Sequence, residues 1–331
     1  DILVCRTEHE ISDDIKNKLA LFCNVEVDSV IQSIDASTIY EVPLLMKNEK
    51  LDQVVLKKLD LKISNGTNLE KWSSFVDRLK FPKNKIKIGL IGKYVELQDS
   101  YKSILESLIH AGSENETQVE VVSIHSEYID EKQIKNEICK LDGVLVAPGF
   151  GSRGIEGKIE AIRCAREENI PFFGICLGMQ MAVIEFSRNI LGLKDANSTE
   201  MEENTPHPVI ALMENQKNIT NKGGTMRLGS WECKIESNSK VSEIYKSEII
   251  SERHRHRWEL NDNYRDELNK KGLKSCGTNP ETGLVEIIEL SSNDWFIGVQ
   301  FHPEYKSTVE CPHPLFVSFV KACLNYKKSK N

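Results

Sequence analysis

The sequence has no hydrophobic run long enough to cross a membrane and no strong excess of charge of one sign. Its 331 residues carry 43 basic and 50 acidic side chains, which gives a formal net charge of −7. No apolar run approaches the ~20 residues that a membrane-spanning helix needs. The charge balance argues against a protein that binds nucleic acid through a broad basic surface. We therefore expect neither a membrane nor a nucleic acid as a partner.

Paired cysteine motifs are missing as well. None of the nine cysteines forms a C-x-x-C pair, which argues against a zinc ribbon, and their odd number argues against a closed disulfide framework. We expect free thiols, a reducing cytoplasmic location and no metal site. The chain also lacks the G-x-x-x-x-G-K-[S/T] pattern of a phosphate-binding loop.

The length of the chain predicts about two domains. The first 85 residues differ from the rest in their pattern of apolar and polar residues. The chain begins with Asp1 rather than Met and runs directly into the apolar segment 2–4, which predicts that it enters a domain part-way through. We expect a strand at 2–5, a helix at 13–23 and an apolar strand-like run at 30–34. The turn-rich, polar stretch 61–85 surrounds one short helix and predicts a linker.

From residue 86 onward, apolar strand patterns alternate with helical patterns of ten to fifteen residues. This alternation predicts a doubly wound, mostly parallel sheet flanked by helices, an α/β fold. In the last third, residues 284–290 and 295–301 predict an additional antiparallel pair. Residues 326–331 are rich in lysine and predict a solvated tail. The expected strands are 86–92, 119–125, 143–147 and 171–176, and the expected helices are 100–111, 157–168 and 178–187.

Cys176 lies where an apolar strand is expected to give way to a helix. Gly174 and Gly178 flank it two residues away on either side. Flanking glycines allow the sharp turn of a nucleophile elbow, and a helix N-terminus lowers the pKa of a thiol. A buried structural cysteine is the alternative, and the elbow pattern alone does not decide between the two.

A nucleophilic cysteine needs a base, and the base needs a group that orients it. His302 and Glu304 follow an apolar strand pattern two residues apart, so in an extended segment both would project to one face. A carboxylate there can fix the imidazole tautomer and stabilise the imidazolium. Together with the elbow, this pair favours catalysis over a structural role.

Nucleophilic attack on a carbonyl also needs two N–H donors for the developing oxyanion. Leu177 follows the nucleophile and supplies one candidate N–H. The glycine-rich turn 146–154 supplies the other, and because Pro148 has no N–H, the donor there is expected to be Gly149. An ordinary turn or an anion-binding nest remains the alternative for this loop.

These residues carry a family resemblance. Residues 171–180 and 300–304 resemble the class I (triad-type) glutamine amidotransferases, and residues 149–158, 195–200, 223–229 and 252–257 more narrowly resemble the CTP synthase family. Residues 1–60 resemble the end of that family's synthetase (amidoligase) domain. The resemblance implies a synthetase portion at 1–60, a linker at 61–85, a glutaminase domain at 86–325 and a tail at 326–331.

The resemblance implies a role for each matching residue. Cys176 would attack the glutamine side-chain amide, form a γ-glutamyl thioester and release ammonia, with His302 as base and acid and Glu304 orienting it. Glu200 and Arg257 would hold the α-amino and α-carboxylate groups, a pairing that suits a zwitterion. The oxyanion and glutamine-contact positions would be Gly149, Leu177, Gly178, Met179 and Gln180.

The resemblance also implies a larger enzyme. In the family, the ammonia reaches the synthetase domain, where UTP activated by ATP, with Mg²⁺, is aminated to CTP, and GTP activates the glutaminase. The glutaminase step itself needs no cofactor, and the complete enzyme is expected to be a homotetramer. Lys18 matches a pyrimidine-nucleotide contact, Ala36 a backbone contact to ATP, and Arg153 an arginine of an allosteric lid. We expect most of the ATP and UTP machinery to precede Asp1, so that this chain hydrolyses glutamine but does not make CTP.

Two features depart from or complicate the family pattern. Where the family usually has Pro-Gly-Gly-Phe-Gly, residues 147–151 read Ala-Pro-Gly-Phe-Gly; the spacing to Cys176 is kept, so the donor is expected to survive at Gly149. In the run Arg-His-Arg-His-Arg at 253–257, an extended backbone would put the arginines on one face and the histidines on the other. Only Arg257 is assigned to substrate, and the other four are expected to be structural or at a domain contact.

Two other functions remain as alternatives. The chain could be the glutaminase of another triad amidotransferase, although the Arg/His run and the N-terminal sixty residues disfavour this. It could also be a catalytically silent regulatory or assembly module.

Overall fold

The computed structural model describes residues 1–62, 68–127, 131–212 and 226–330, which form two compact units, Asp1–Lys80 and Phe81–Asn331. The glycines and threonine at 223–225 of the expected family motif, and Asn331 of the expected tail, lie outside the described residues. No helix in these ranges is both long and apolar enough to span a membrane.

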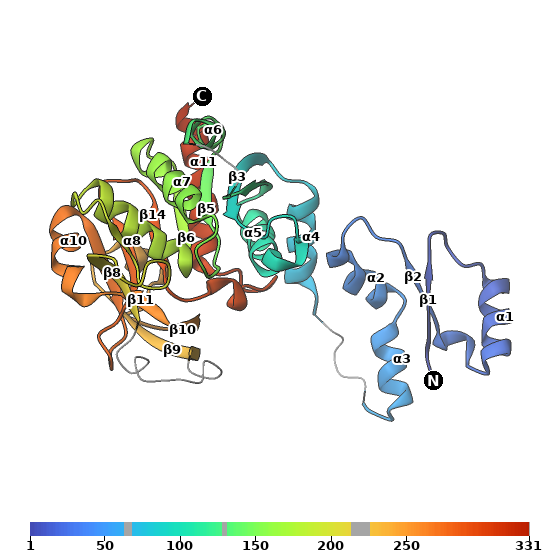
Figure 1. Cartoon of the computed structure of the whole chain (residues 1–331). Coiled ribbons are helices and arrows are strands. Elements are labelled where there is room, and N and C mark those ends of the chain that lie inside the picture. Colours follow the sequence, from blue (N-terminus) through green and yellow to red (C-terminus); the bar gives the residue numbers. More distant parts are fainter. Residues whose placement is uncertain (63–67, 128–130, 213–225, 331) are drawn as a thin grey trace. The chain divides into compact units, whose positions relative to one another are not determined.

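The first unit is a small α/β fragment (Figure 1). Its two strands pair in parallel, as expected for the edge of a βαβ arrangement. In the stretch expected as a linker, a helix packs within this unit: Phe75 is fully buried, 5.0 Å from the ring of Tyr40. The elements are β1 (Leu3–Thr7), α1 (Asp13–Cys23), β2 (Val30–Ile34), α2 (Val42–Asn48), α3 (Leu51–Lys58) and α4 (Glu70–Lys80).

The second unit is built on a nine-stranded sheet in the order β10-β9-β12-β13-β14-β6-β5-β3-β4. The strands from β14 to β4 are parallel and the others antiparallel, which confirms the predicted fold class and the antiparallel pair near 284–301. The strands are β3 (Asn84–Gly92), β4 (Thr117–His125), β5 (Gly143–Val146), β6 (Phe172–Ile175), β9 (Arg227–Ile235), β10 (Ile249–His256), β12 (Leu273–Thr278), β13 (Val285–Leu290) and β14 (Phe296–Val299).

Helices cover both faces of this sheet because its parallel strands alternate between two hydrophobic cores. Along β6, Phe172 belongs to one core, and Phe173 and Ile175 belong to the other. Helices α7 and α8 pack on the first face, and α5 and α11 on the second (Figure 1). The helices are α5 (Lys102–Glu114), α6 (Glu131–Ile138), α7 (Ile155–Glu167), α8 (Leu177–Asn189), α9 (Lys240–Tyr245), α10 (Arg265–Lys271) and α11 (Pro314–Lys330).

Two local features complete the second unit. A three-stranded sheet in the order β11-β8-β7 consists of β7 (Ala196–Ser198), β8 (His207–Leu212) and β11 (Trp258–Leu260). Helix α11 continues to Lys330, so the described part of the expected tail is helical, and Lys327 donates a hydrogen bond to the carbonyl of Lys85.

Candidate active site

Cys176 forms a sharp turn between β6 and α8. Its backbone has φ 52° and ψ −102°, a conformation that costs a non-glycine residue about 1–3 kcal/mol. Two close approaches show why glycines flank it: a Cβ on Gly178 would lie 2.3 Å from the carbonyl oxygen of Val146, and one on Gly174 would lie 2.7 Å from the backbone of Gly178. The Cys176 N–H donates to the carbonyl of Val299, 2.7 Å away, so the neighbouring strand holds the elbow in place.

His302 and Glu304 form a buried pair. The Nδ1 atom of His302 lies 2.8 Å from Oε1 of Glu304, and each residue is 5% exposed. The contact was predicted from an extended backbone, and this detail is wrong: Glu304 lies in a 3₁₀ turn, η6 (Pro303–Lys306), and His302 precedes the turn with φ −114°. The tight turn brings the carboxylate back to the ring, where strand spacing would only place the two on one face.

The environment of His302 favours its charged form. Burial alone would lower the pKa of His302, but the neighbouring Cys176 and the Glu304 carboxylate together raise it to about 11. Its Nε2 atom is buried and makes no hydrogen bond of ordinary geometry to a described residue. The Tyr305 ring stacks on the imidazole at 5.4 Å. The arrangement suits a thiolate and imidazolium pair.

A chain of two glutamine side chains also reaches Cys176. Gln180 donates through Nε2 to the carbonyl of Trp258, 2.8 Å away, and to Oε1 of Gln300, 3.2 Å away. Because Oε1 of Gln300 accepts that bond, its Nε2 is left to face the Cys176 sulfur at 3.7 Å. Gln300 is fully buried, so its amide is held as a donor toward the thiol.

The loop after β5 is held by two buried lysines. Lys158 of α7 donates through Nζ to the carbonyl of Ala147, 2.9 Å away, and Lys93 donates to the carbonyl of Phe150. Gly149 lies between these two anchor points. The Lys93 ammonium also lies 4.9 Å from the centre of the Phe150 ring, within range of a cation–π contact.

Glu200 approaches the same loop from the end of β7. Its Oε1 accepts a hydrogen bond from the Gly151 N–H at 2.9 Å. Burial raises the pKa of Glu200, although the Gly151 N–H and the Lys93 charge act in the opposite direction. The carboxylate is half-buried and one of its oxygens is already oriented by the loop.

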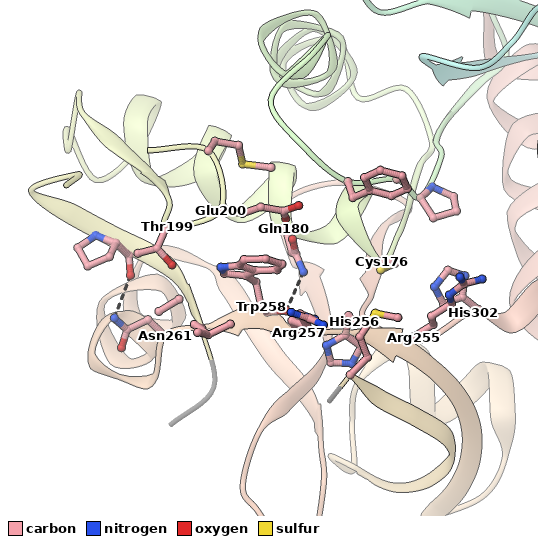
Figure 2. Close-up of a pocket in the computed structure, with 18 of the residues that line it drawn as sticks. Cys176, Gln180, Thr199, Glu200, Arg255, His256, Arg257, Trp258, Asn261 and His302 are labelled. Carbon is pink, nitrogen blue, oxygen red and sulfur yellow. Dashed lines mark hydrogen bonds between the residues drawn. The ribbon is translucent and has the colours of Figure 1, made fainter. Parts of the chain in front are cut away.

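These groups surround one cavity of ≈ 1410 Å³. Figure 2 shows Cys176 and His302 toward one end of the lining and Thr199 toward the other. The predicted site residues that line it are Gly149, Cys176, Gln180, Glu200, Arg257 and His302. Arg255 and His256, which were expected to be structural or at a domain contact, line it as well.

The sheet explains why distant residues meet. Strands β14, β6 and β5 are neighbours and run parallel, so the segments after their carboxyl ends emerge at the same edge. Those segments carry His302, Cys176 and Gly149, respectively. Sites of α/β proteins commonly occupy this edge of the sheet.

Other predicted residues lie away from the cavity lining. Leu177, Gly178 and Met179 are buried in the first turn of α8, so they could face a ligand only through their backbone N–H groups, as helix N-termini do. Arg153 is exposed before α7 and pairs with Glu127 at 3.4 Å. In the first unit, Lys18 is exposed on α1 and Ala36 is half-buried after β2.

The Arg/His run alternates as predicted, with the side chains of Arg253 and Arg255 exposed and His254 and His256 buried. Nδ1 of His254 lies 2.9 Å from Nε2 of His256. Burial, followed by neighbouring positive charge, lowers the pKa of His254 to about 2 and that of His256 to about 3.

A buried acidic pair lies beside these rings. Arg227 lies 2.5 Å from Glu286 and 3.6 Å from Glu259. Burial raises the pKa of Glu286 to about 7, although Arg227 acts in the opposite direction. Burial and the neighbouring Glu286 carboxylate raise the pKa of Glu259 to about 8, again against the effect of Arg227. This cluster supports the strand that leads into Arg257.

Sequence reasoning assigned no role to Gln300, Lys93 or Lys158. Gln300 precedes the predicted base and shows no signal of its own. Lys158 shares a helix face with Ile155, Ile159 and Ile162, all buried, and that helical spacing could have indicated a buried lysine.

Among the described residues, no cluster of three or more histidine, cysteine, aspartate or glutamate side chains is placed to hold a metal ion.

Comparison with known proteins decides the family. Residues 96–322 match the family described as glutamine amidotransferase class-I. The chain belongs to the class-I glutamine amidotransferase family. Residues 1–61 match the CTP synthase N-terminus, as the resemblance implied for 1–60.

Several relatives of this amidotransferase are CTP synthases. It is 66% identical over 328 residues to a CTP synthase of Flavobacterium johnsoniae and 64% identical over 332 residues to one of Christiangramia forsetii. These matches cover 99% and 100% of the chain, and the chain spans 61% of the length of each relative. The solved glutaminase domain of Trypanosoma brucei CTPS, with bound acivicin, is 38% identical with a TM-score of 0.69 and covers 72% of this chain and 94% of that one. The chain is thus a CTP synthase family member with a glutamine amidotransferase domain.

Proposed function

We propose that the second unit hydrolyses L-glutamine to glutamate and ammonia through Cys176, His302 and Glu304. The observation that carries the proposal is the elbow at Cys176, which places a thiol at the start of α8 in one cavity with His302, whose Nδ1 atom lies 2.8 Å from Glu304. The class-I amidotransferase match and the glutaminase relative support the same activity.

The first half of the reaction forms a thioester. The Cys176 thiolate attacks the side-chain amide carbon of glutamine, and the N–H groups of Gly149 and Leu177 stabilise the oxyanion. His302, which the raised pKa keeps protonated, gives its proton to the amide nitrogen. The carbon–nitrogen bond then breaks, ammonia leaves, and a γ-glutamyl group remains on the sulfur.

The second half releases glutamate. His302, now neutral, takes a proton from water, and the resulting hydroxide attacks the thioester carbon. The carbon–sulfur bond breaks, and the thiolate and imidazolium pair is restored. Glu304 stabilises the imidazolium through Nδ1 in both halves.

Glutamine recognition would use two charged residues of the cavity lining. Glu200 would hold the α-amino group and Arg257 the α-carboxylate, with Gln180 and the backbone N–H groups of Gly178 and Met179 completing the contacts. The Gly151 N–H that orients Glu200 supports this assignment. A carboxylate and a guanidinium together select a zwitterionic amino acid.

The relatives are named CTP synthases. In a complete enzyme of that kind, the ammonia would aminate UTP that has been activated by ATP with Mg²⁺. GTP would activate the glutaminase, and Arg153 would belong to its lid. Residues 1–60 would be the end of the synthetase domain, 61–85 a linker and 86–325 the glutaminase domain of a cytoplasmic homotetramer. Lys18 and Ala36 would contribute nucleotide contacts, and this chain alone would stop at glutamine hydrolysis.

The proposal is tested with a glutamine-mimicking electrophile such as acivicin, the compound bound in the trypanosomal relative. We expect it to form a thioether with Cys176, located by mass spectrometry, and to stop glutamate release. The exposed thiols of Cys23 and Cys311 serve as internal controls. Modification of those two with Cys176 unmodified would contradict the assignment.

A Cys176→Ala variant measures the background rate. We expect glutamate release to fall to the level without protein, since the thioester cannot form. Wild-type release equal to that of the variant, with and without GTP and a supplied synthetase portion, would favour the catalytically silent module instead.

A further inference from the structure

Lys158 is a buried lysine that the proposed reaction does not use. Its side chain is entirely buried in α7, and within the described part of the chain no carboxylate lies in ion-pair distance of it. Among the described residues, the Lys158 ammonium makes one hydrogen bond, from Nζ to the carbonyl of Ala147, 2.9 Å away. Lysine is almost never fully buried unless it is paired, so this position needs an explanation.

The ammonium group lies directly beneath the loop that carries Gly149. A Cβ placed on Gly149 would be 3.7 Å from Nζ of Lys158 and 3.8 Å from Cε of Lys93. Lys158 donates to the carbonyl of Ala147, before Gly149, and Lys93 donates to the carbonyl of Phe150, after it. The two lysines thus fix both ends of the peptide segment that presents the Gly149 N–H.

The charged groups around Lys158 are few. Burial, followed by the nearby Lys93 charge, lowers the pKa of Lys158 to about 7, and Cys176 is the group that acts in the opposite direction. Such coupling is reciprocal: if a thiolate at Cys176 favours the ammonium, the ammonium favours the thiolate by the same free energy. Cys176 is therefore the group acting on Lys158 that favours its charged form.

We propose that Lys158 is a positioning residue of the glutaminase site, which holds the Gly149 loop through the Ala147 carbonyl and favours the Cys176 thiolate with its charge. This inference rests on the proposed function and names a further group for the same reaction. Lys158 does not line the cavity, so it acts through the loop and the thiol and does not touch glutamine.

The test compares Lys158→Met, which keeps the length of the side chain but removes its charge and its donor, with Lys321→Met, an exposed lysine of α11. We expect Lys158→Met to lower kcat by about tenfold or more with KM changed by less than about threefold, because transition-state contacts are lost but glutamine contacts are not. Lys321→Met should match the wild type.

The deciding readout is the alkylation of Cys176 by iodoacetamide as a function of pH, followed on the Cys176 peptide by mass spectrometry. In Lys158→Met the midpoint should rise by about one pH unit, because the thiolate loses a nearby positive charge. The thermal midpoint should stay equal or rise, since a buried charge is replaced by an apolar side chain.

An alkylation midpoint equal to that of the wild type would overturn the inference, even if kcat fell, because a packing role alone would not move the thiol titration. A variant that unfolds would be replaced by Lys158→Gln, which keeps a donor for the Ala147 carbonyl without the charge and should show the same midpoint shift. If the wild type itself neither releases glutamate nor reacts at Cys176 with acivicin, the proposed function fails. If the wild type does both but Lys158→Met shows the wild-type alkylation midpoint, only the inference about Lys158 fails.

Discussion

At the scale of single residues, the site depends on charges that burial makes expensive. His302 keeps a raised pKa in a buried position because Cys176 and Glu304 lie beside it. After Cys176, the Glu304 carboxylate is the group that raises the pKa of His302. A change that removes the charge of Glu304 but keeps its shape isolates this effect.

We predict that Glu304→Gln lowers kcat for glutamine hydrolysis by roughly tenfold to a hundredfold, because the imidazolium loses its neighbouring negative charge. The sign follows from the pKa: the carboxylate raises the pKa of His302, so its removal lowers that pKa and disfavours the thiolate and imidazolium pair at neutral pH. Steady-state kinetics between pH 6 and 9 measure the loss. Glu310→Gln, an exposed neighbour, is the matched control, and equal kcat values for the two variants would contradict this role of Glu304.

At the scale of elements, the turn from β6 into α8 leaves little space for side chains. Its two glycines sit against backbone atoms of β5 and α8, which cannot move away as a flexible side chain can. The glycine of the β5 loop has more room: a Cβ on Gly149 would lie 3.4 Å from Cδ2 of Leu177, an ordinary contact.

We predict that Gly178→Ala lowers the free energy of unfolding by about 1–3 kcal/mol or more, because its Cβ would lie 2.3 Å from the carbonyl oxygen of Val146. Gly149→Ala should change it by less than about 1 kcal/mol, within the usual range for a tolerated substitution. Urea unfolding of both variants measures the difference. Equal midpoints would mean that the elbow has more space than the structure shows.

The elements themselves were largely predictable because their signals are local. The helix at 13–23, the parallel strands and the antiparallel pair of β13 and β14 all follow from periodicity and turn residues. Non-local pairing explains what was missed: β9 joins β12 only through Gly277 and Thr278, and β11 (Trp258–Leu260) pairs with β8 (His207–Leu212), which is distant in the sequence. The helical end of α11 was missed because its lysines look solvated while their backbone still continues the helix.

The site follows the same division. Cys176, His302 and Gly149 were predicted together because short motifs carry them, and the parallel order of β14, β6 and β5 places them at one edge. The roles of Gln300 and Lys158 depend on which buried group each side chain meets, and that is set by packing. The η6 turn that joins Glu304 to His302 was missed because the two-residue spacing fits a strand equally well.

At the scale of the whole molecule, the buried acidic pair of Glu259 and Glu286 couples folding to pH. Burial and the neighbouring carboxylate raise the pKa of Glu259 from its ordinary 4.5 to about 8. Between these values the folded chain keeps a proton that the unfolded chain has lost, so stability falls as pH rises through this window. Below the window, this contribution to stability is fully present.

We predict that Glu259→Gln flattens the fall in unfolding free energy between pH 5 and 8, since the amide does not titrate. Urea unfolding across this range measures the slope. Glu248→Gln, at an exposed position, should keep the wild-type slope. A slope for Glu259→Gln equal to that of the wild type would contradict the assignment of a retained proton to Glu259.

The central claim is that Cys176 carries the γ-glutamyl group during turnover. The most direct measurement mixes the chain with glutamine, quenches the reaction with acid within one turnover and locates the added mass by peptide mass spectrometry. We predict a γ-glutamyl adduct on the Cys176 peptide that disappears as glutamate accumulates and is absent from Cys176→Ala. Glutamate release without that adduct, or an adduct on another residue, would contradict the account.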